Sequence, residues 1–200
     1  MGTIFCIVGK SSSGKDTIYK KLLKNPLLHL RRIVPYTTRP IRAGEQEGVE
    51  YFFTTVEIME QLRDENKIIE CRSYETVYGT WYYFMAKDRQ IDLDRHSYLV
   101  IGTIESYMKI RDYFGEKKVI PIYIDLEDGE RLSRALRREK KQDQPRYEEM
   151  CRRYIADERD FSAENLEKAG ITRRFDNHSL RDCLKEIADY IYSWYAKNGC

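Results

Sequence analysis

The sequence predicts an α/β fold, with helices covering both faces of a parallel sheet, on the basis of three observations. Short apolar runs rich in β-branched residues are typical of strands that are buried on both faces. Segments whose apolar residues have helical spacing follow most of these runs. The two kinds of segment alternate along the chain, and this alternation is typical of a parallel sheet flanked by helices.

The elements follow in order along the chain. The first strand is predicted at 3–9, "TIFCIVG", and a helix at 15–24 begins directly after a glycine-rich loop. Residues 30–38 are expected to be extended, because Pro35 disfavours a long helix there. The later strands are predicted at 97–103, 119–126 and 171–177, and the later helices at 104–116, 128–139 and 179–197. One face of the last helix collects Leu180, Cys183, Leu184, Ile187, Ile191 and Trp194.

Two regions interrupt this alternation. Residues 36–95 hold short extended pieces around a helix at 55–65, which indicates a small mixed insert on the α/β core. In residues 131–159 one helical segment ends at "QDQP" and a second follows. The sequence contains no internal repeat and no low-complexity linker, so its 200 residues suit one domain that carries these additions.

The composition argues against a nucleic-acid-binding, membrane or secreted protein. The formal net charge of +2 does not suggest a nucleic-acid or membrane partner, and no apolar stretch approaches the ~18–20 residues of a membrane span. The N-terminus shows no signal peptide. The five cysteines are widely spread without C-x-x-C spacing, which favours free thiols in a reducing cytoplasm over disulfides or a zinc site. We therefore expect a cytoplasmic protein.

The glycine-rich loop, "GKSSSGKDT" at 9–17, meets the spacing G-x-x-x-x-G-K with Gly9, Gly14 and Lys15. It lies between a strand and a helix, where successive backbone N–H groups and the positive end of the helix dipole can hold a phosphate. Lys15 is expected to reach the β- and γ-phosphates of ATP. The expected ATP-binding residues of this P-loop are Gly9, Ser11, Ser12, Ser13, Gly14, Lys15, Asp16 and Thr17.

Asp16 stands where such loops usually carry the Ser or Thr whose hydroxyl meets Mg²⁺. Thr17, one residue later, still offers a hydroxyl. Asp16 is either a solvated acid stabilised by the helix dipole, which we favour, or a carboxylate that contacts the metal through water. Asp16 and Thr17 are therefore the two candidate protein contacts for Mg²⁺ bound with ATP.

Two segments of the insert carry a more specific pattern. In "YTTRPIRAGEQEGVEYFF" (36–53) and "IIECRSYETVYGTWY" (68–82), the chain resembles the guanylate kinase family. The matching positions are Arg39, Arg42, Gly44, Glu45, Gly48, Tyr51, Phe52, Glu70, Tyr78, Gly79 and Thr80. The resemblance continues with Arg134, Arg138 and, after a short insertion near "KQDQP", Arg153. It ends at Asn177, where the family has an asparagine near the donor base, so it covers nearly the whole chain.

The resemblance implies a P-loop core (1–35, 96–127 and 162–200), a nucleoside monophosphate-binding insert (36–95) and a helical lid (128–161). It implies ATP-dependent phosphorylation of GMP to GDP, an activity of purine nucleotide metabolism. The phosphate of the acceptor would meet Arg39, Arg42, Tyr51 and Tyr78, which offer guanidinium and phenol donors.

The guanine base of the acceptor would meet Glu70 and Thr80. One carboxylate can accept from both the N1 hydrogen and the exocyclic amine of guanine, and Thr80 can donate to its oxygen. The alternative for Glu70 is a salt bridge to a nearby basic residue such as Arg72.

An arginine stripe is predicted on the first lid helix. Arg131, Arg134 and Arg138 lie at i, i+3 and i+7, a spacing that is most often a solvated face. Phosphoryl transfer offers another use, because arginines stabilise the charge that spreads over the transferring group. Lys15, Arg134, Arg138 and Arg153 are accordingly the catalytic candidates.

The chain also departs from the family pattern. Acidic residues expected at the end of strand 97–103 are replaced by Val100 and Gly102, for which Glu105 or Asp125 are candidate substitutes, and Tyr36 replaces a small hydroxyl residue. A different acceptor, either another nucleoside monophosphate or a ribose bisphosphate, therefore stays open. So does an inactive interaction domain, although the intact P-loop argues against it. The expected partners are nucleotides, without nucleic acid or membrane; the oligomeric state is not predicted.

Overall fold

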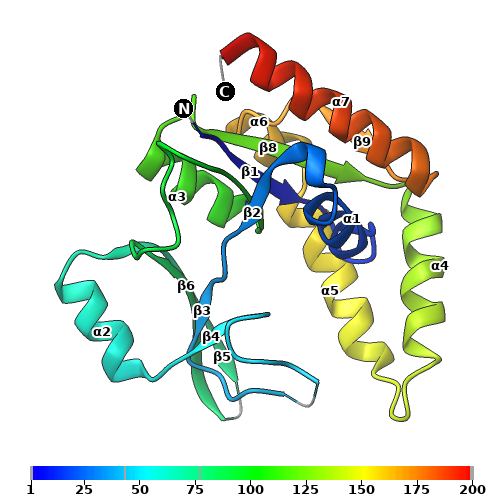
Figure 1. Ribbon diagram of the computed structural model, residues 1–200. Helices are drawn as coiled ribbons and strands as arrows, with labels where there is room; N and C mark the ends of the chain where they lie inside the picture. Colours follow the sequence, from blue (N-terminus) through cyan, green and yellow to red (C-terminus); the bar gives the residue numbers. More distant parts are fainter. Residues whose placement is uncertain (1, 43, 77, 199–200) are drawn as a thin grey trace.

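The computed structural model describes residues 2–42, 44–76 and 78–198 (Figure 1). Its core is a five-stranded parallel sheet in the order β2-β7-β1-β8-β9. The strands are β1 (Ile4–Val8), β2 (Leu30–Arg32), β7 (Ser97–Ile101), β8 (Val119–Asp125) and β9 (Arg174–Asp176). The central strand β1 is wholly buried, as its unbroken apolar sequence predicts. The predicted α/β fold class is confirmed.

Helices cover both faces of this sheet, because successive side chains of β1 point to opposite faces. Ile4, Cys6 and Val8 pack with α3 (Ile104–Phe114) and α6 (Ala163–Lys168). Phe5 and Ile7 pack with α1 (Lys15–Leu23) and α7 (Leu180–Asn198). The short helix α6 and a 3₁₀ turn at Pro26–Leu28 are elements that the sequence patterns did not predict.

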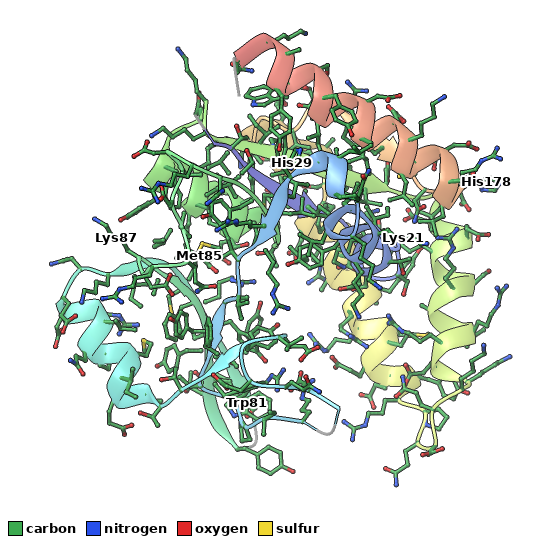
Figure 2. All side chains as sticks on the ribbon, in the orientation of Figure 1. Lys21, His29, Trp81, Met85, Lys87 and His178 are labelled. Carbon is green, nitrogen blue, oxygen red and sulfur yellow. The ribbon has the colours of Figure 1, made fainter. Side chains whose placement is uncertain are left out.

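The insert forms a second sheet in the order β4-β3-β6-β5. Its elements are β3 (Tyr36–Thr37), β4 (Phe52–Phe53), α2 (Val56–Asp64), β5 (Ile68–Thr76) and β6 (Gly79–Ala86). One face packs around Met59 of α2, whereas Met85, near the core end of β6, packs into the core cluster (Figure 2). Residues 30–38, predicted as one extended segment, are divided between the two sheets.

The segment expected to form the lid is a pair of helices, α4 (Asp128–Glu139) and α5 (Tyr147–Asp160). In Figure 1 this pair and the insert both extend downward from the core, on opposite sides of the view. The carboxyl ends of β1 and β7 lead into the P-loop and α3, so these segments meet at one edge of the sheet. In open α/β sheets this edge is where ligands bind.

The cysteines in the described residues are Cys6, Cys71, Cys151 and Cys183, and all are free thiols; Cys200 lies outside the described residues. None of the helices described here combines the length and apolar character that crossing a bilayer requires.

Candidate active site

The P-loop connects the end of β1 to the start of α1. Gly14, at the N-cap of α1, has φ 92° and no side-chain cap, so the helix begins with backbone N–H groups that no cap satisfies. Ser12 has φ 65°, an unusual value for a residue with a side chain. Gly9 crosses β8 so closely that a Cβ atom there would lie 2.7 Å from the Ile124 carbonyl oxygen. This backbone conformation, with uncapped N–H groups at the start of α1, is suited to binding an anion.

Buried polar atoms around the loop add to this character. Among the described residues, the hydroxyls of Ser12 and Ser13 and the side-chain oxygen of Asn177 are buried without a hydrogen-bond partner. Buried polar groups are normally satisfied, so such a cluster suits a site that takes up a polar ligand. Asn177 does contact the loop, since its Nδ2 donates to the Ser13 carbonyl at 2.6 Å.

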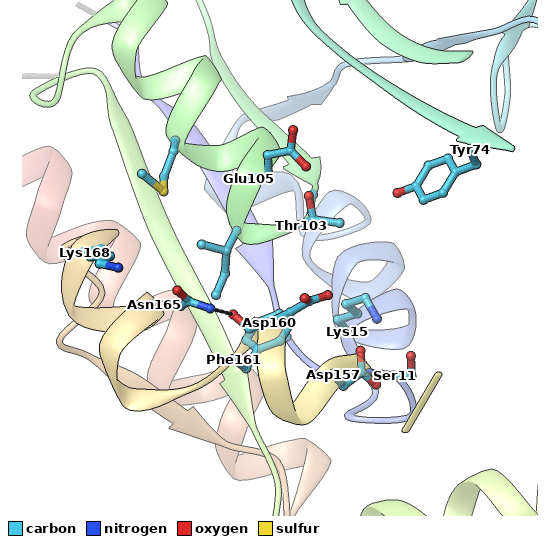
Figure 3. A pocket seen from close by; sticks show the side chains of 14 residues that line it. Ser11, Lys15, Tyr74, Thr103, Glu105, Asp157, Asp160, Phe161, Asn165 and Lys168 are labelled. Atoms are coloured by element: carbon cyan, nitrogen blue, oxygen red, sulfur yellow. Dashed lines mark hydrogen bonds between the residues drawn. The ribbon is translucent and has the colours of Figure 1, made fainter. Parts of the chain in front are cut away.

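Lys15 lies where two cavities adjoin. The first, of about 580 Å³, contains Ser11, Thr103, Glu105 and Asp157 in its lining (Figure 3). The second, of about 370 Å³, lies against the insert. Both cavities are lined by Lys15, Tyr74, Gly102 and Thr103. An anion bound by the P-loop and a ligand held by the insert would therefore approach each other at the Lys15 ammonium.

The charges around Lys15 are mixed. Burial lowers the pKa of its ammonium, Asp16 and Asp157 oppose that effect, and Arg138 and Arg153 reinforce it. The ammonium lies 3.5 Å from the Lys10 carbonyl oxygen, at the limit of a hydrogen bond. A half-buried ammonium with weak contacts is suited to meet an added anion.

The arginine stripe of α4 divides into separate environments. Arg131 is only 1% exposed and lies over the Tyr154 ring at 3.8 Å, which contradicts the solvated-face interpretation for this residue. Arg134 donates to the Asn177 carbonyl at 3.1 Å and pairs with Glu130. Arg138 and Arg153 line a small hollow together with Ser11 and Ser12. The three catalytic arginine candidates thus gather around the P-loop.

An ionic network links the lid to the P-loop, and sequence reasoning missed it. The Asp157 carboxylate accepts from the Ser11 backbone N–H at 2.8 Å and pairs with Arg131 at 3.4 Å. Lys10 pairs with Asp128 at 3.2 Å and with Glu158 at 2.8 Å. Arg131 also pairs with Asp128 and Glu158. The Asp157 carboxylate therefore accepts from one of the loop N–H groups that are expected to meet phosphate.

The second cavity is lined by one face of the β5–β6 hairpin. Glu70, Arg72 and Tyr74 alternate along β5 and share this face with Tyr83 and Met85 of β6. Arg72 donates from Nε and Nη2 to the two carboxylate oxygens of Glu70, at 3.1 and 3.2 Å. Burial raises the pKa of the Glu70 carboxyl, and Arg72 opposes this rise.

Thr80 does not line the cavity that contains Glu70. It pairs with Glu75 on the opposite strand, and its hydroxyl donates to the Glu75 carboxylate at 2.9 Å. Glu75 lies an odd number of positions along β5 from Glu70, so the two side chains point to opposite faces of the hairpin. Tyr78 is 83% exposed near the hairpin end and stacks on Trp81. The structure thus separates both residues from Glu70.

The two arginines expected at the acceptor phosphate have different surroundings. Arg39 is buried, forms a bidentate pair with Glu45 at 2.7 and 2.5 Å, and lies 5.0 Å from the Tyr51 ring centre. Arg42 is exposed. Tyr51 lines the second cavity, where it also contacts Tyr83 edge-on. Tyr51 is therefore the one of these three that faces the Glu70 cavity.

The positions that depart from the family pattern have local explanations. A Cβ atom at Gly102 would lie 2.3 Å from the Ser106 hydroxyl, so a larger side chain there requires Ser106 to move. Of the candidate substitutes, Glu105 lines the first cavity and pairs with Lys109. Asp125 pairs instead with Arg174. The Tyr36 hydroxyl donates to Asp88 at 2.7 Å, which fixes this ring inside the insert.

The metal candidates are both exposed. Asp16 lines a third cavity, between α1 and the insert, and Thr17 lies in the first turn of α1. Among the residues that the structure describes, no cluster of three or more His, Cys, Asp or Glu side chains could hold a metal ion. Mg²⁺ that arrives with nucleotide phosphates needs only one or two protein oxygens, and the exposed Asp16 and Thr17 oxygens fit that requirement.

Comparisons with known proteins support one family. Over 81 residues the chain is 38% identical to the guanylate kinase of Photorhabdus laumondii subsp. laumondii, and over 80 residues it is 44% identical to that of Mycoplasmoides gallisepticum. Each match covers 40% of this chain, and the matches span 39% and 41% of these relatives, about two fifths of their length.

The fold has a solved counterpart. The crystal structure of guanylate kinase from Anaplasma phagocytophilum superposes with a TM-score of 0.68 at 21% identity, covering 96% of this chain and 85% of that one. The sequence model of the family described as Guanylate kinase matches residues 1–193, nearly the whole chain. The chain therefore belongs to the guanylate kinase family.

Proposed function

We propose that the protein transfers the γ-phosphoryl group of ATP to GMP, giving ADP and GDP. The observation that carries this proposal is the place of Lys15, between the P-loop cavity and the cavity that contains Glu70. Membership in the guanylate kinase family supports both substrates. The intact loop, with its uncapped helix N-terminus, favours an enzyme over an inactive interaction domain.

In this proposal ATP binds with its phosphates on the P-loop, at the N–H groups of residues 11–17 and the Lys15 ammonium. Mg²⁺ bound to those phosphates would neutralise charge on them, with Asp16 and Thr17 as its protein contacts. Asn177 and Arg134 hold the loop in place through the Ser13 and Asn177 carbonyls. The segments 36–95 and 128–161 serve as acceptor insert and lid.

The acceptor is an oxygen of the GMP phosphate, which is already deprotonated at neutral pH. It attacks the γ-phosphorus in line while the bond to the bridging oxygen of ADP breaks, so the reaction requires no general base. Lys15, Arg138 and Arg153 supply the positive charge that stabilises the transferring group. The free thiols of the described cysteines are consistent with our proposal that this chemistry takes place in the cytoplasm.

A coupled assay of ADP release tests the proposal with GMP, dGMP, AMP, CMP, UMP and ribose 1,5-bisphosphate as acceptors. We expect GMP to be the preferred acceptor. Lys15→Ala should lower kcat by at least about 10²-fold, because the variant lacks a charge aimed at the reacting phosphates. Lys21→Ala is the matched control, since Lys21 is exposed on the same helix (Figure 2) and should keep full activity.

Wild-type protein that phosphorylates none of these acceptors would refute the enzymatic proposal. Preference for another acceptor would refute GMP as the substrate. Full activity of Lys15→Ala with an unchanged melting temperature would remove the loop from the mechanism.

A further inference from the structure

The Glu70–Arg72 pair places hydrogen-bond acceptors and hydrogen-bond donors side by side in one cavity. Glu70 is 4% exposed and contributes acceptors alone when it is ionised. Arg72 is largely buried beside it and contributes donors alone. Both side chains come from the same face of β5 and line the same cavity of about 370 Å³. A ligand that satisfies both must carry donors and acceptors along one edge.

The contact between Glu70 and Arg72 does not use all of their hydrogen-bond donors and acceptors. Arg72 uses Nε and Nη2 on Glu70, and within the described part of the chain Nη1 makes no hydrogen bond. Each carboxylate oxygen has about two lone-pair directions, and Arg72 occupies one on each. Hydrogen-bonding capacity therefore remains on both residues for a ligand.

A neutral base suits this pair better than a phosphate does. A phosphate bound to Arg72 would lie close to the Glu70 carboxylate, and the two anions would repel each other. The guanidinium charge is already balanced by Glu70. Tyr51, Tyr74 and Tyr83 line the same cavity and give it the aromatic walls that a purine ring can pack against.

We propose that Arg72 is a specificity-determining residue that reads the acceptor base. For guanine to bind, Arg72 moves off the side of the Glu70 carboxylate that it contacts through Nε and Nη2. Glu70 then accepts from the N1 hydrogen and the exocyclic amine of guanine, while Arg72 donates to O6 and N7. In proteins that read DNA, a two-pronged contact from arginine to O6 and N7 is the commonest specific contact to guanine. The inference rests on the proposed GMP kinase function and names a residue of that same site.

Arg72 takes this place because the other expected donor is absent from the cavity. Thr80 points to the opposite face of the hairpin and donates to Glu75. Arg72, two residues from Glu70, is already in contact with its carboxylate. Adenine would be rejected twice, since its N6 amine would oppose the Arg72 donors and its N1 acceptor would oppose Glu70.

The test compares the equilibrium binding of GMP and 7-deaza-GMP, which lacks only the N7 acceptor, by titration calorimetry. Wild-type protein should bind GMP about five- to tenfold more tightly, within the range of one arm of a bidentate contact. In Arg72→Gln and Arg72→Ala this ratio should fall to about one. Arg63→Gln, an exposed arginine of α2 that pairs with Glu60, is the control and should keep the ratio.

Two results would overturn the inference. The first is wild-type protein that binds GMP and 7-deaza-GMP equally tightly. The second is an affinity ratio in Arg72→Gln that equals the wild-type ratio, even if both ligands bind more weakly. The second result would mean that Arg72 only positions Glu70 or contacts the phosphate. ATP binding and thermal unfolding report whether each variant is folded. If the neutral variants unfold, Arg72→Lys carries the same test, because it keeps the charge beside Glu70 and removes the planar fork.

Turnover is measured separately, so the two proposals can fail independently. Wild-type protein that binds GMP with the expected ratio but releases no ADP would contradict the kinase proposal and leave Arg72 as a base-reading residue. GMP turnover with an unchanged ratio in the variants would keep the kinase proposal and remove this role of Arg72.

Discussion

Gly14 occupies a backbone position that favours glycine for two separate reasons. Its φ of 92° lies in the region that residues with a side chain rarely adopt. A Cβ atom there would also lie 2.2 Å from Nδ2 of Asn177, the atom that donates to the Ser13 carbonyl. The same residue thus sets the start of α1 and allows Asn177 to hold the loop.

Gly14→Ala should therefore cost more than backbone strain alone. Gly115→Ala is the matched control, because Gly115 has φ 93° and open space where its Cβ would be added. We expect Gly115→Ala to lower the free energy of unfolding by about 1 kcal/mol and Gly14→Ala by roughly 2–4 kcal/mol, measured by urea denaturation. Equal losses in the two variants would show that the contact with Asn177 carries no energy.

At the residue scale, the sequence predicted the loop better than the acceptor cavity. The glycines and lysine of a P-loop are adjacent in the chain, so their spacing alone defines the geometry. Glu70 and Thr80 were expected to read one base, but which face Thr80 occupies depends on the hairpin register, in which it opposes Glu75. In that register Thr76 pairs with Gly79, and the family pattern did not reveal this pairing.

At the element scale, the contact of α5 with the P-loop is the feature that gives the lid its position. Asp157 accepts from the Ser11 N–H across a separation of 146 residues, and Lys10 reaches Glu158 across 148. The sequence predicted both lid helices, because helical periodicity is local. It could not predict which carboxylates reach the loop, because that depends on how α4 and α5 pack against each other.

Asp157→Asn should strengthen ATP binding. The amide oxygen can still accept from the Ser11 N–H, while the negative charge is removed from the place where phosphates are expected. Arg131 keeps Asp128 and Glu158 as partners, so the lid should remain folded. At low salt we expect about fivefold tighter binding, equivalent to about 1 kcal/mol, with a smaller effect at high salt.

Titration of ATP at two salt concentrations measures this effect. Glu148→Gln, at an exposed position of the same helix, is the control and should bind ATP as wild type does. Weaker ATP binding by Asp157→Asn would contradict the prediction and indicate that the carboxylate positions the loop for ATP.

At the scale of the whole molecule, the core and the insert are two separate sheets that meet where Ile69 and Met85 pack into the core cluster. Lys109 of α3 donates to the Cys71 carbonyl of β5 at 3.0 Å, and Gln90 exchanges hydrogen bonds with Val34 where the chain passes between the sheets. Tyr74 comes from the insert, and Lys15 and Thr103 from the core, yet all three line both cavities (Figure 3). A shift of the insert would therefore change both cavities together.

Such a shift is expected when both substrates are bound. An open site would let water compete with GMP for the γ-phosphoryl group, and closure excludes that water. A bisubstrate analogue that joins adenosine and guanosine through a chain of phosphates should therefore compact the protein. Small-angle scattering should show a radius of gyration below the ligand-free value, which chain length places at about 16 Å.

ATP alone, which leaves the Glu70 cavity unfilled, should compact the protein less. An unchanged scattering profile at saturating analogue would mean that the insert does not move toward the core, and that water must be excluded by the ligands themselves.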